Sequence, residues 1–562
     1  MRVFFANRSG LISLLLVFCF FTFFLGLGSQ AITDADEAFY AEASREMVES
    51  GDWLTPRFNY QHRWEKPVLY YWLTATTYLA TGPNEFAARL WSALSGVGLA
   101  LLAWAIARHA TSRLDVAWLA GTIVATSFGY FAMARAALPD LPLTFCITLA
   151  IWAALRAIDV ASERRAGPSG PATTWWVLGG ASAGAGFLMK GPVALVVPAL
   201  VLLPIAWREW RRLRLEIRGV AVAVLTAAVV GLPWYVAMWI EHGNPYLQSF
   251  FVADNFERFA TERFNEARPF WFYLPVLLGG LLPWSLFLTV FVVEGLAGAR
   301  KRTLKLADTD WRLLLWAIMP LLFFTLSVGK QPRYILPVLP PLAVLLARGL
   351  IERIETARNH RWSLGAATWA TAAMYVALAL LFVRMEPLLI DAYPVATWVA
   401  VCLLGCSAIA LAGIAATAAW RHLPIVAGVA GVVTLVAVQY GAFAGVRPEA
   451  VEQLAALIRT NRQASEPIGV FKVFSRNLGF YTGAPRTELF DVKQASDFIQ
   501  SPRRVLLVLR SSDVAAVELT SQMTLKKLGE TRYLNTANIR LRTLLRPDPT
   551  TELEMVSLVS NR

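Results

Sequence analysis

Long apolar runs separated by short polar turns fill most of the chain. A transmembrane helix needs roughly 20 apolar residues, and runs of about 17–25 are tolerated. The segment 67–81 is shorter, is rich in aromatic residues and ends at Gly82-Pro83. The pattern predicts an all-α polytopic membrane protein with about thirteen transmembrane helices, at residues 9–29, 86–107, 114–134, 141–158, 174–189, 191–207, 219–240, 270–298, 313–329, 334–350, 364–383, 394–419 and 423–445.

The positions of Lys and Arg set the expected orientation, because these residues accumulate in cytoplasmic loops. With a cytoplasmic N-terminus, and with 67–81 left out of the spans, the basic clusters all fall on the cytoplasmic side. We therefore expect 67–81 to be an interfacial or re-entrant helix within a long first outer loop. The clusters are Arg108/Arg113, Arg164/Arg165, Arg208/Arg211/Arg212/Arg214/Arg218, Arg300/Lys301/Arg302/Lys305, Arg353/Arg358/Arg361 and Arg421.

The composition changes near residue 445, where the apolar runs give way to polar and charged sequence. A helical stretch at 449–462 and strand-like runs at 468–474 and 505–509 predict a small α/β domain of ordinary domain size. An odd number of spans places this domain outside. We expect a transmembrane domain at 1–445, which includes a first periplasmic loop with juxtamembrane helices at 31–85, and a periplasmic α/β domain at 446–562.

Composition agrees with a membrane protein and narrows the function. Hydrophobic residues make up 56% of the chain and charged residues only 16%, against about 25% charged in soluble domains. The formal net charge of +13 is accounted for by cytoplasmic loops, so we expect no nucleic-acid partner. The four cysteines lie in apolar runs without metal-ligand spacing, so whether a metal binds is unknown from the sequence.

The outer turns combine acids with isolated cations. The first loop carries Asp34, Asp36 and Glu37 just past the first span, and Asp140 lies in another turn. A lone Lys or Arg at a helix end usually reaches for the membrane interface, but here several turns on one face each offer a cation. Cations in a partly dry cleft suit a phosphate. A phosphate-bearing lipid handled at this face is the first interpretation, and a transporter is the alternative.

A set of motifs in these loops resembles a known family. The runs DADEAFYAEASREMVESGDWLTP, EKPVLYYW, MKGP, NFERF and GKQPRYILPVLPPLA resemble the GT-C glycosyltransferases that use polyprenyl-phosphate sugars. They are most similar to the lipid A 4-amino-4-deoxy-L-arabinose transferases, glycosyltransferase family 83, which are related to the protein O-mannosyltransferases. The resemblance implies a GT-C fold and sugar transfer from undecaprenyl phosphate–aminoarabinose to a lipid A phosphate, which lowers the binding of cationic peptides such as polymyxin.

The resemblance also implies residue roles. The acids Asp36, Glu37 and Asp140 are the candidate catalytic residues, although Glu37 and Asp140 also suit the first turn of a helix. The predicted carrier phosphate-binding residues are Lys66, Arg258, Tyr334, Lys190 and Lys330. Tyr40 and Glu65 are candidates for contacting the sugar or orienting the site, and Tyr40 also suits core packing. The family often has a basic residue where this chain has Phe39, which leaves the sugar contacts open.

The expected partners are the donor lipid, lipid A and the surrounding membrane lipids, in a bacterial inner membrane and with a monomer as the working unit. Because protein cations can stabilise a phosphate leaving group, we expect no required cofactor. One alternative is another GT-C enzyme, similar to protein O-mannosyltransferases, in which Asp36 deprotonates a hydroxyl acceptor. Another is a lipid-carrier transporter, which predicts charges through the bilayer midplane; the predicted spans hold few.

Overall fold

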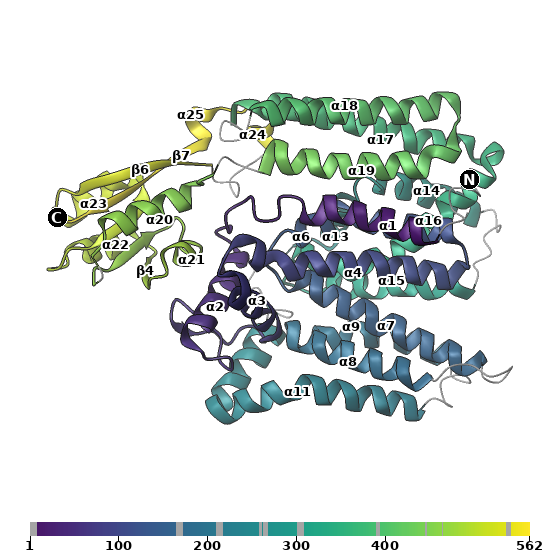
Figure 1. Ribbon diagram of the computed structural model, residues 1–562, viewed down its shortest axis with the longest axis horizontal. Helices are drawn as coiled ribbons and strands as arrows, with labels where there is room; N and C mark the ends of the chain where they lie inside the picture. The colour runs from purple at the N-terminus through teal and green to yellow at the C-terminus, as the bar shows by residue number, and fades with distance from the viewer. Residues whose placement is uncertain are drawn as a thin grey trace.

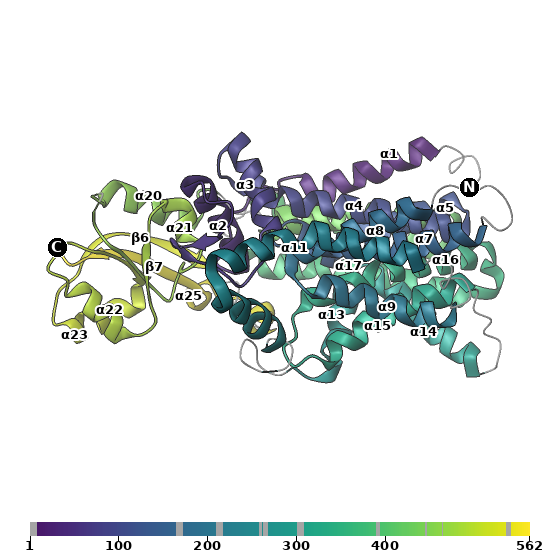
Figure 2. The same cartoon turned by 90° about the horizontal axis from the view of Figure 1, so that it is seen from below.

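The computed structural model describes residues 8–163, 172–209, 217–257, 261, 268–300, 308–388, 394–443, 447–463, 465–534 and 541–562. A bundle of long helices forms most of the molecule, and a small sheet domain lies at one end of it (Figure 1). Helices from the first loop lie at that same end, between the bundle and the sheet domain, in both views (Figure 2). The described part of the N-terminal helix begins at the opposite end of the bundle.

The helices of the bundle coincide with the predicted apolar runs. Within the described residues, eight helices are long and apolar enough to cross a membrane, or nine if one bent pair counts as a single span. The chain is therefore a multi-pass membrane protein, and the count of thirteen stays a prediction. The helices are α1 (Arg8–Cys19), α4 (Glu85–Thr111), α5 (Leu114–Ala125), α6 (Phe128–Ala134), α7 (Asp140–Glu163), α8 (Ala172–Lys190), α9 (Val193–Arg208), α11 (Ile217–Leu247), α13 (Tyr273–Gly280), α14 (Ser285–Arg300), α15 (Asp308–Leu326), α16 (Leu339–Glu355), α17 (Ala357–Met385), α18 (Pro394–Thr417) and α19 (Leu423–Val438).

Two runs that we predicted as continuous spans are broken in the structure. The run 114–134 bends by 57° between α5 and α6, and 270–298 divides into α13 and α14. The two breaks meet: the Phe128 amide donates to the Leu282 carbonyl at 3.0 Å, and Trp284 Nε1 donates to Thr126 Oγ1 at 2.8 Å. Each break thus satisfies polar groups of the other, which a chain surrounded by lipid requires.

The first loop folds into short helices packed on the end of the bundle. Helix α2 (Asp36–Ser50) has Asp36 and Glu37 in its first turn, where the helix dipole favours carboxylates. Gly51 caps its C-terminal end with a φ of 70°, which suits glycine. A two-stranded ribbon follows, β1 (Arg57–Phe58) with β2 (Gln61–His62). Helix α3 (Leu69–Thr81) has 13 residues, too few to cross a membrane, as we expected for 67–81.

Residues 241–257, which follow the predicted span 219–240, are helical. Helix α11 continues through this region, with a break at Gly243, whose φ is 67°. A wider helical segment, η2 (Gln248–Glu257), follows directly. This segment brings Asp254 and Asn255 next to residues of the bundle helices. The two residues therefore line the cavity that is described below.

The C-terminal domain contains the α/β architecture that the sequence predicted. Its sheet has the strand order β4-β3-β5-β7-β6, and β3 pairs in parallel with both β4 and β5. The predicted strand runs correspond to β3 and β5. Its strands and helices are α20 (Ala450–Asn461), β3 (Ile468–Phe471), α21 (Leu478–Thr482), β4 (Arg486–Leu489), α22 (Val492–Ile499), β5 (Leu506–Arg510), α23 (Val514–Ser521), β6 (Lys526–Leu534), α24 (Leu541–Leu545), α25 (Pro549–Glu552) and β7 (Leu553–Ser560).

Candidate active site

A cavity of about 360 Å³ opens where the end of the bundle meets the first loop. This volume lies in the usual range for small-molecule sites. Charged side chains occupy part of its wall and apolar side chains most of the rest. The lining residues are Lys66, Asp140, Leu143, Thr144, Ile147, Lys190, Pro192, Val193, Val196, Phe251, Asp254, Asn255, Phe256, Phe323, Phe324, Ser327, Gly329, Arg333, Tyr334 and Pro337.

Asp140 lies at the centre of the charged wall. It is the first residue of α7 and is only 4% exposed. Lys190, the last residue of α8, places its Nζ 2.5 Å from Asp140 Oδ1, and the Nε atom of Arg333 lies 3.6 Å from the same oxygen. Ends of different helices therefore bring two cations to one carboxylate, which fixes all three side chains at the cavity wall.

Arg333 joins Asp140 to the first loop. It belongs to the short helix η4 (Pro332–Val338), and its Nη2 donates a hydrogen bond to Asp36 Oδ2. Burial alone would raise the pKa of Asp36, but Arg333, Arg476 and Lys190 together hold that pKa below its ordinary value. Asp36 is therefore ionised across the physiological range and contacts Arg333 of the cavity wall; its catalytic role stays a prediction.

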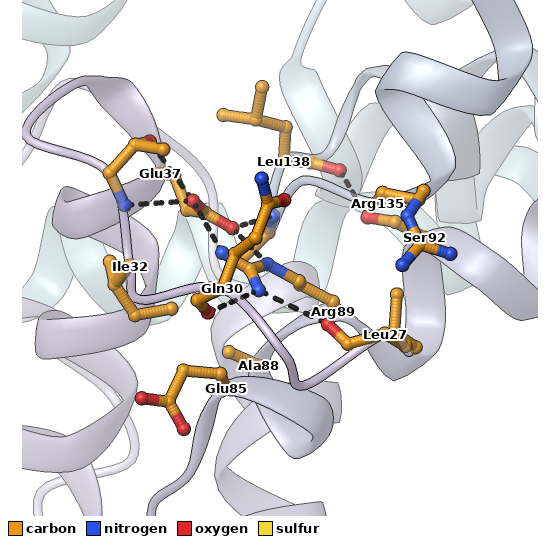
Figure 3. A network of polar contacts seen from close by, with 12 residues as sticks. Leu27, Gln30, Ile32, Glu37, Glu85, Ala88, Arg89, Ser92, Arg135 and Leu138 are labelled. Atoms are coloured by element: carbon orange, nitrogen blue, oxygen red, sulfur yellow. Dashed lines mark hydrogen bonds and ion pairs between the residues drawn. The ribbon is translucent and has the colours of Figure 1, made fainter. Parts of the chain in front are cut away.

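Glu37, the neighbour of Asp36, lies in a separate buried network (Figure 3). Its carboxylate oxygens accept hydrogen bonds from Arg89 at 2.7 and 3.1 Å and from the backbone amides of Thr33 and Ala137. Arg89 also donates to the carbonyls of Leu27, Gln30 and Ala31. This geometry favours a structural role in joining the first loop to the bundle, and a catalytic role of Glu37 stays a prediction.

The predicted phosphate-binding residues divide into three groups. Lys66, Lys190 and Tyr334 line the cavity, and Lys190 Nζ lies 5.3 Å from the centre of the Tyr334 ring. Lys330 is only 7% exposed and donates to the Ser327 carbonyl at 2.5 Å, so it holds the turn that follows α15. Arg258 lies outside the described residues.

The two site-orienting candidates lie next to the cavity wall and not among its lining residues. Tyr40 is buried and stacks on Tyr71, with ring centres 5.3 Å apart. This contact is the core packing that we considered as its other role. The Glu65 carboxylate lies 3.3 Å from the guanidinium of Arg63, and that guanidinium covers one face of Phe39 at 4.0 Å from the ring centre.

Sequence reasoning missed Arg333, the residue that connects the two acids. A signal was present, because Arg333 stands in the same GKQPRY run as Lys330 and Tyr334. The short helix η4 starts at Pro332, and its geometry determines which of these side chains faces the first loop. Among the described residues no group of three or more His, Cys, Asp or Glu side chains is placed to hold a metal ion.

Comparisons with known proteins agree with the predicted resemblance. The family model described as dolichyl-phosphate-mannose-protein mannosyltransferase matches residues 11–242. The undecaprenyl phosphate-α-4-amino-4-deoxy-L-arabinose arabinosyl transferase of Edwardsiella ictaluri is 37% identical over 330 residues, covering 58% of this chain and 57% of the relative. A similarly named protein of Pseudomonas fluorescens is 33% identical over 392 residues, covering 68% of each chain.

The aligned region thus spans between 57% and 64% of the length of the first three curated relatives. The fold extends further than this alignment. The crystal structure of ArnT from Cupriavidus metallidurans bound to undecaprenyl phosphate superposes with a TM-score of 0.71 over 98% of both chains, at 21% identity. The chain belongs to the family of undecaprenyl phosphate-α-4-amino-4-deoxy-L-arabinose arabinosyl transferases.

Proposed function

We propose that this protein transfers 4-amino-4-deoxy-L-arabinose from undecaprenyl phosphate to a phosphate of lipid A. The observation that carries this proposal is the cavity whose wall combines Lys66, Lys190, Arg333 and Tyr334 with long apolar surfaces. Membership in the family supports it, as does the name of the ArnT structure, which contains undecaprenyl phosphate. The added amino sugar would reduce the negative charge of lipid A and so give resistance to polymyxin and other cationic peptides.

The shape of the wall suits a phosphate attached to a long prenyl chain. Lysine provides compact positive charge, and arginine provides a planar fork of donors for phosphate oxygens. Beside these groups, Val193, Val196 and Phe323 form apolar surface on which an isoprenoid can lie. We assign the carrier phosphate to the Lys66, Lys190 and Tyr334 side of the cavity.

The transfer needs a good leaving group more than a strong base. The bond between the anomeric carbon and the carrier phosphate oxygen breaks, and its electron pair leaves with undecaprenyl phosphate. A bond forms between that carbon and an oxygen of the acceptor phosphate, which is already anionic near neutral pH. The cations stabilise the charge on the leaving phosphate, which lowers the barrier by electrostatics.

The two acids then have separate tasks. Asp36 carries a negative charge beside Arg333 of the cavity wall, where it can stabilise positive charge developing on the sugar or orient the acceptor through Arg333. Asp140 already binds Lys190 and approaches Arg333. We propose that it binds the sugar ammonium while it keeps these two cations in place.

We propose that the site faces the periplasm of a bacterial inner membrane and that the working unit is a monomer. Support comes from the basic clusters of the sequence, all of which fall on the other side of the predicted spans. The C-terminal domain and the first loop lie at one end of the bundle (Figures 1 and 2), so one reporter tests both. A tag placed after Arg447 should be accessible only from the periplasm, and cytoplasmic labelling would reject this orientation.

Lipid A from a strain that lacks the gene tests the activity. Mass spectrometry should show loss of the aminoarabinose-modified lipid A and its return when the wild-type gene is supplied. Lipid A that keeps its modification in the deletion strain, with glycans missing from a protein or another hydroxyl acceptor, would instead identify a different GT-C transferase.

We further propose that no divalent metal is required, because Lys66, Lys190 and Arg333 provide positive charge at the cavity wall. Purified enzyme assayed with donor and lipid A should keep its rate within about twofold after treatment with a chelator. Activity that is abolished by the chelator and restored by one added metal would reject this proposal.

A further inference from the structure

The loop after β3 carries an arginine of the C-terminal domain toward the catalytic acids. Strand β3 lies between β4 and β5 and runs parallel to both. The chain leaves β3 toward β4 and then crosses to β5 on the other side. Ligands of such sheets bind outside the carboxyl ends of the strands, at the position where the strand order reverses. Residues 472–477 occupy this position.

The backbone of this loop is under local strain. Lys472 and Phe474 have φ values of 60° and 53°, in the left-handed region that residues with a side chain seldom adopt. Such conformations persist where the surrounding structure enforces them, and they are concentrated at ligand-binding sites. The second of these residues, Phe474, lies two positions before Arg476.

The loop is fixed to the segment that carries Asp36. Asp34 Oδ1 accepts hydrogen bonds from the amides of Arg476 at 2.7 Å and Asn477 at 3.1 Å, and Asn477 Nδ2 donates to the Ile32 carbonyl at 2.8 Å. Since Asp34 and Asp36 are two residues apart, the position of Arg476 relative to Asp36 is set by short bonds and not by distant domain packing.

The side chain of Arg476 is placed to bind an anion. Its Nη1 lies 3.9 Å from Asp36 Oδ1, which is longer than a hydrogen bond. Its guanidinium carbon lies 5.0 Å from the centre of the Phe39 ring, and the side chain is 43% exposed. Within the described residues its donors make no hydrogen bond to the protein, so they remain able to bind a phosphate.

Arg476 ends a row of alternating charges that begins in the cavity. Lys190 contacts Asp140, Asp140 lies near Arg333, Arg333 contacts Asp36, and Asp36 lies near Arg476. We call these five residues the charge row. Lys190 lines the cavity at one end, whereas the other end reaches the C-terminal domain.

We propose that Arg476 binds a phosphate of the acceptor lipid, so that the C-terminal domain provides part of the acceptor site. This inference rests on the proposed function, because it assumes that the carrier phosphate binds at the Lys190 end. The side chain of Arg476 is partly exposed and lies beside Phe39, at the end of the charge row away from the assigned carrier phosphate. This position favours binding of the acceptor phosphate over binding of the carrier phosphate.

Purified full-length R476A, R476K and R503A variants test the proposal. Arg503 is an exposed arginine before β5, at the opposite end of the parallel strands, and is the matched control. With saturating donor, R476A should raise the KM for bisphosphorylated lipid A by about 10–100-fold, because a charged hydrogen bond is lost. The KM for the donor should change by less than about twofold. R476K should recover part of the loss, and R503A should match wild type.

Two outcomes would overturn the proposal. A raised KM for the donor with an unchanged KM for lipid A would place Arg476 at the carrier phosphate. Unchanged values for both substrates would remove it from the binding site. If R476A does not fold, R476K and R476Q provide the same comparison with the shape of the side chain largely kept.

A binding measurement separates this inference from the proposed function. The wild-type protein in nanodiscs is titrated with bisphosphorylated lipid A in the absence of donor. R476A should weaken binding by about 10-fold or more. Wild-type protein that binds lipid A through Arg476 but transfers no sugar would reject the proposed function and keep this inference; equal binding by R476A and wild type would reject the inference.

Discussion

Asp36 and Glu37 are adjacent in the sequence and belong to two different regions of the molecule. Glu37 is 3% exposed and accepts hydrogen bonds from Arg89 and two backbone amides. The Asp36 side chain is 43% exposed and belongs to the charge row. Successive residues of a helix point about 100° apart, so one carboxylate turns into the bundle and the other toward the cavity.

The difference lies in what surrounds each of the two carboxylates. In the buried network, Arg89 is fully enclosed and uses its donors on Glu37 and on backbone carbonyls. In the charge row, acids and cations alternate and the Arg476 end remains open to a ligand. The buried network fixes the first loop to the bundle, and the charge row leaves charged side chains able to bind a substrate. Variants of each region should therefore change different quantities.

The largest expected effect is on folding, in the E37Q variant. Removing the charge of Glu37 leaves Arg89 buried without its counter-ion, which typically costs about 3–5 kcal/mol. We expect a strong decrease in the yield of folded protein and in the thermal unfolding midpoint. Replacing both residues by leucine should recover much of the loss. A stable E37Q protein with a large decrease in the rate constant would show that Glu37 acts in the reaction, and would remove the contrast with Asp36.

The D36N variant should show the opposite pattern. Amide for carboxylate keeps the shape of the side chain but removes a charge from the centre of the charge row. We expect kcat to decrease by about 10²–10³-fold, with an unfolding midpoint close to that of wild type. E49Q on the same helix is the matched control, because Glu49 is half exposed and pairs with Arg45. Equal activity of D36N and E49Q would contradict our assignment of Asp36.

The sequence predicts part of this contrast and not all of it. Lys66, Lys190 and Tyr334 were identified because the runs EKPVLYYW, MKGP and GKQPRYILPVLPPLA resemble motifs of a known family. The separate orientations of Asp36 and Glu37 depend on where α2 begins, and a difference of one residue in that start exchanges the two. Arg476 was not predicted, because its place beside Asp36 depends on how two separate parts of the chain dock.

The same reasoning applies to the fold. The apolar runs identified where the bundle helices lie because hydrophobic length is a direct signal. The bend between α5 and α6 leaves no such signal, since a bent run is as apolar as a straight one. The break that it contacts, around Leu282, lies 148 residues beyond Ala134, the last residue of α6. Only the tertiary structure shows that Thr126 and Trp284 form a hydrogen bond across these two breaks.

A third acid of α2, Glu46, sharpens the comparison with a smaller effect. Glu46 is 1% exposed, and its Oε1 atom has no hydrogen-bond partner in the described part of the chain. Burial, and then repulsion from Glu42, raise the pKa of Glu46 to about 7. Glu37 has an arginine to neutralise it, whereas Arg45, whose charge partly offsets the raised pKa of Glu46, is engaged by Glu42 at 2.8 Å.

The sign of the pH dependence follows from this raised pKa. The unfolded chain releases the Glu46 proton near pH 4.5, while the folded protein keeps it until about pH 7, so stability decreases as pH rises through this window. Above about pH 7 the full loss of folding stability from the buried Glu46 charge is present, on the order of 1–3 kcal/mol. E46Q should therefore raise the unfolding midpoint at pH 8 and change it little at pH 5, with E49Q unchanged at both. An equal effect of E46Q at the two pH values would mean that Glu46 is already charged in the folded protein, and that α2 holds this carboxylate as it holds Glu37.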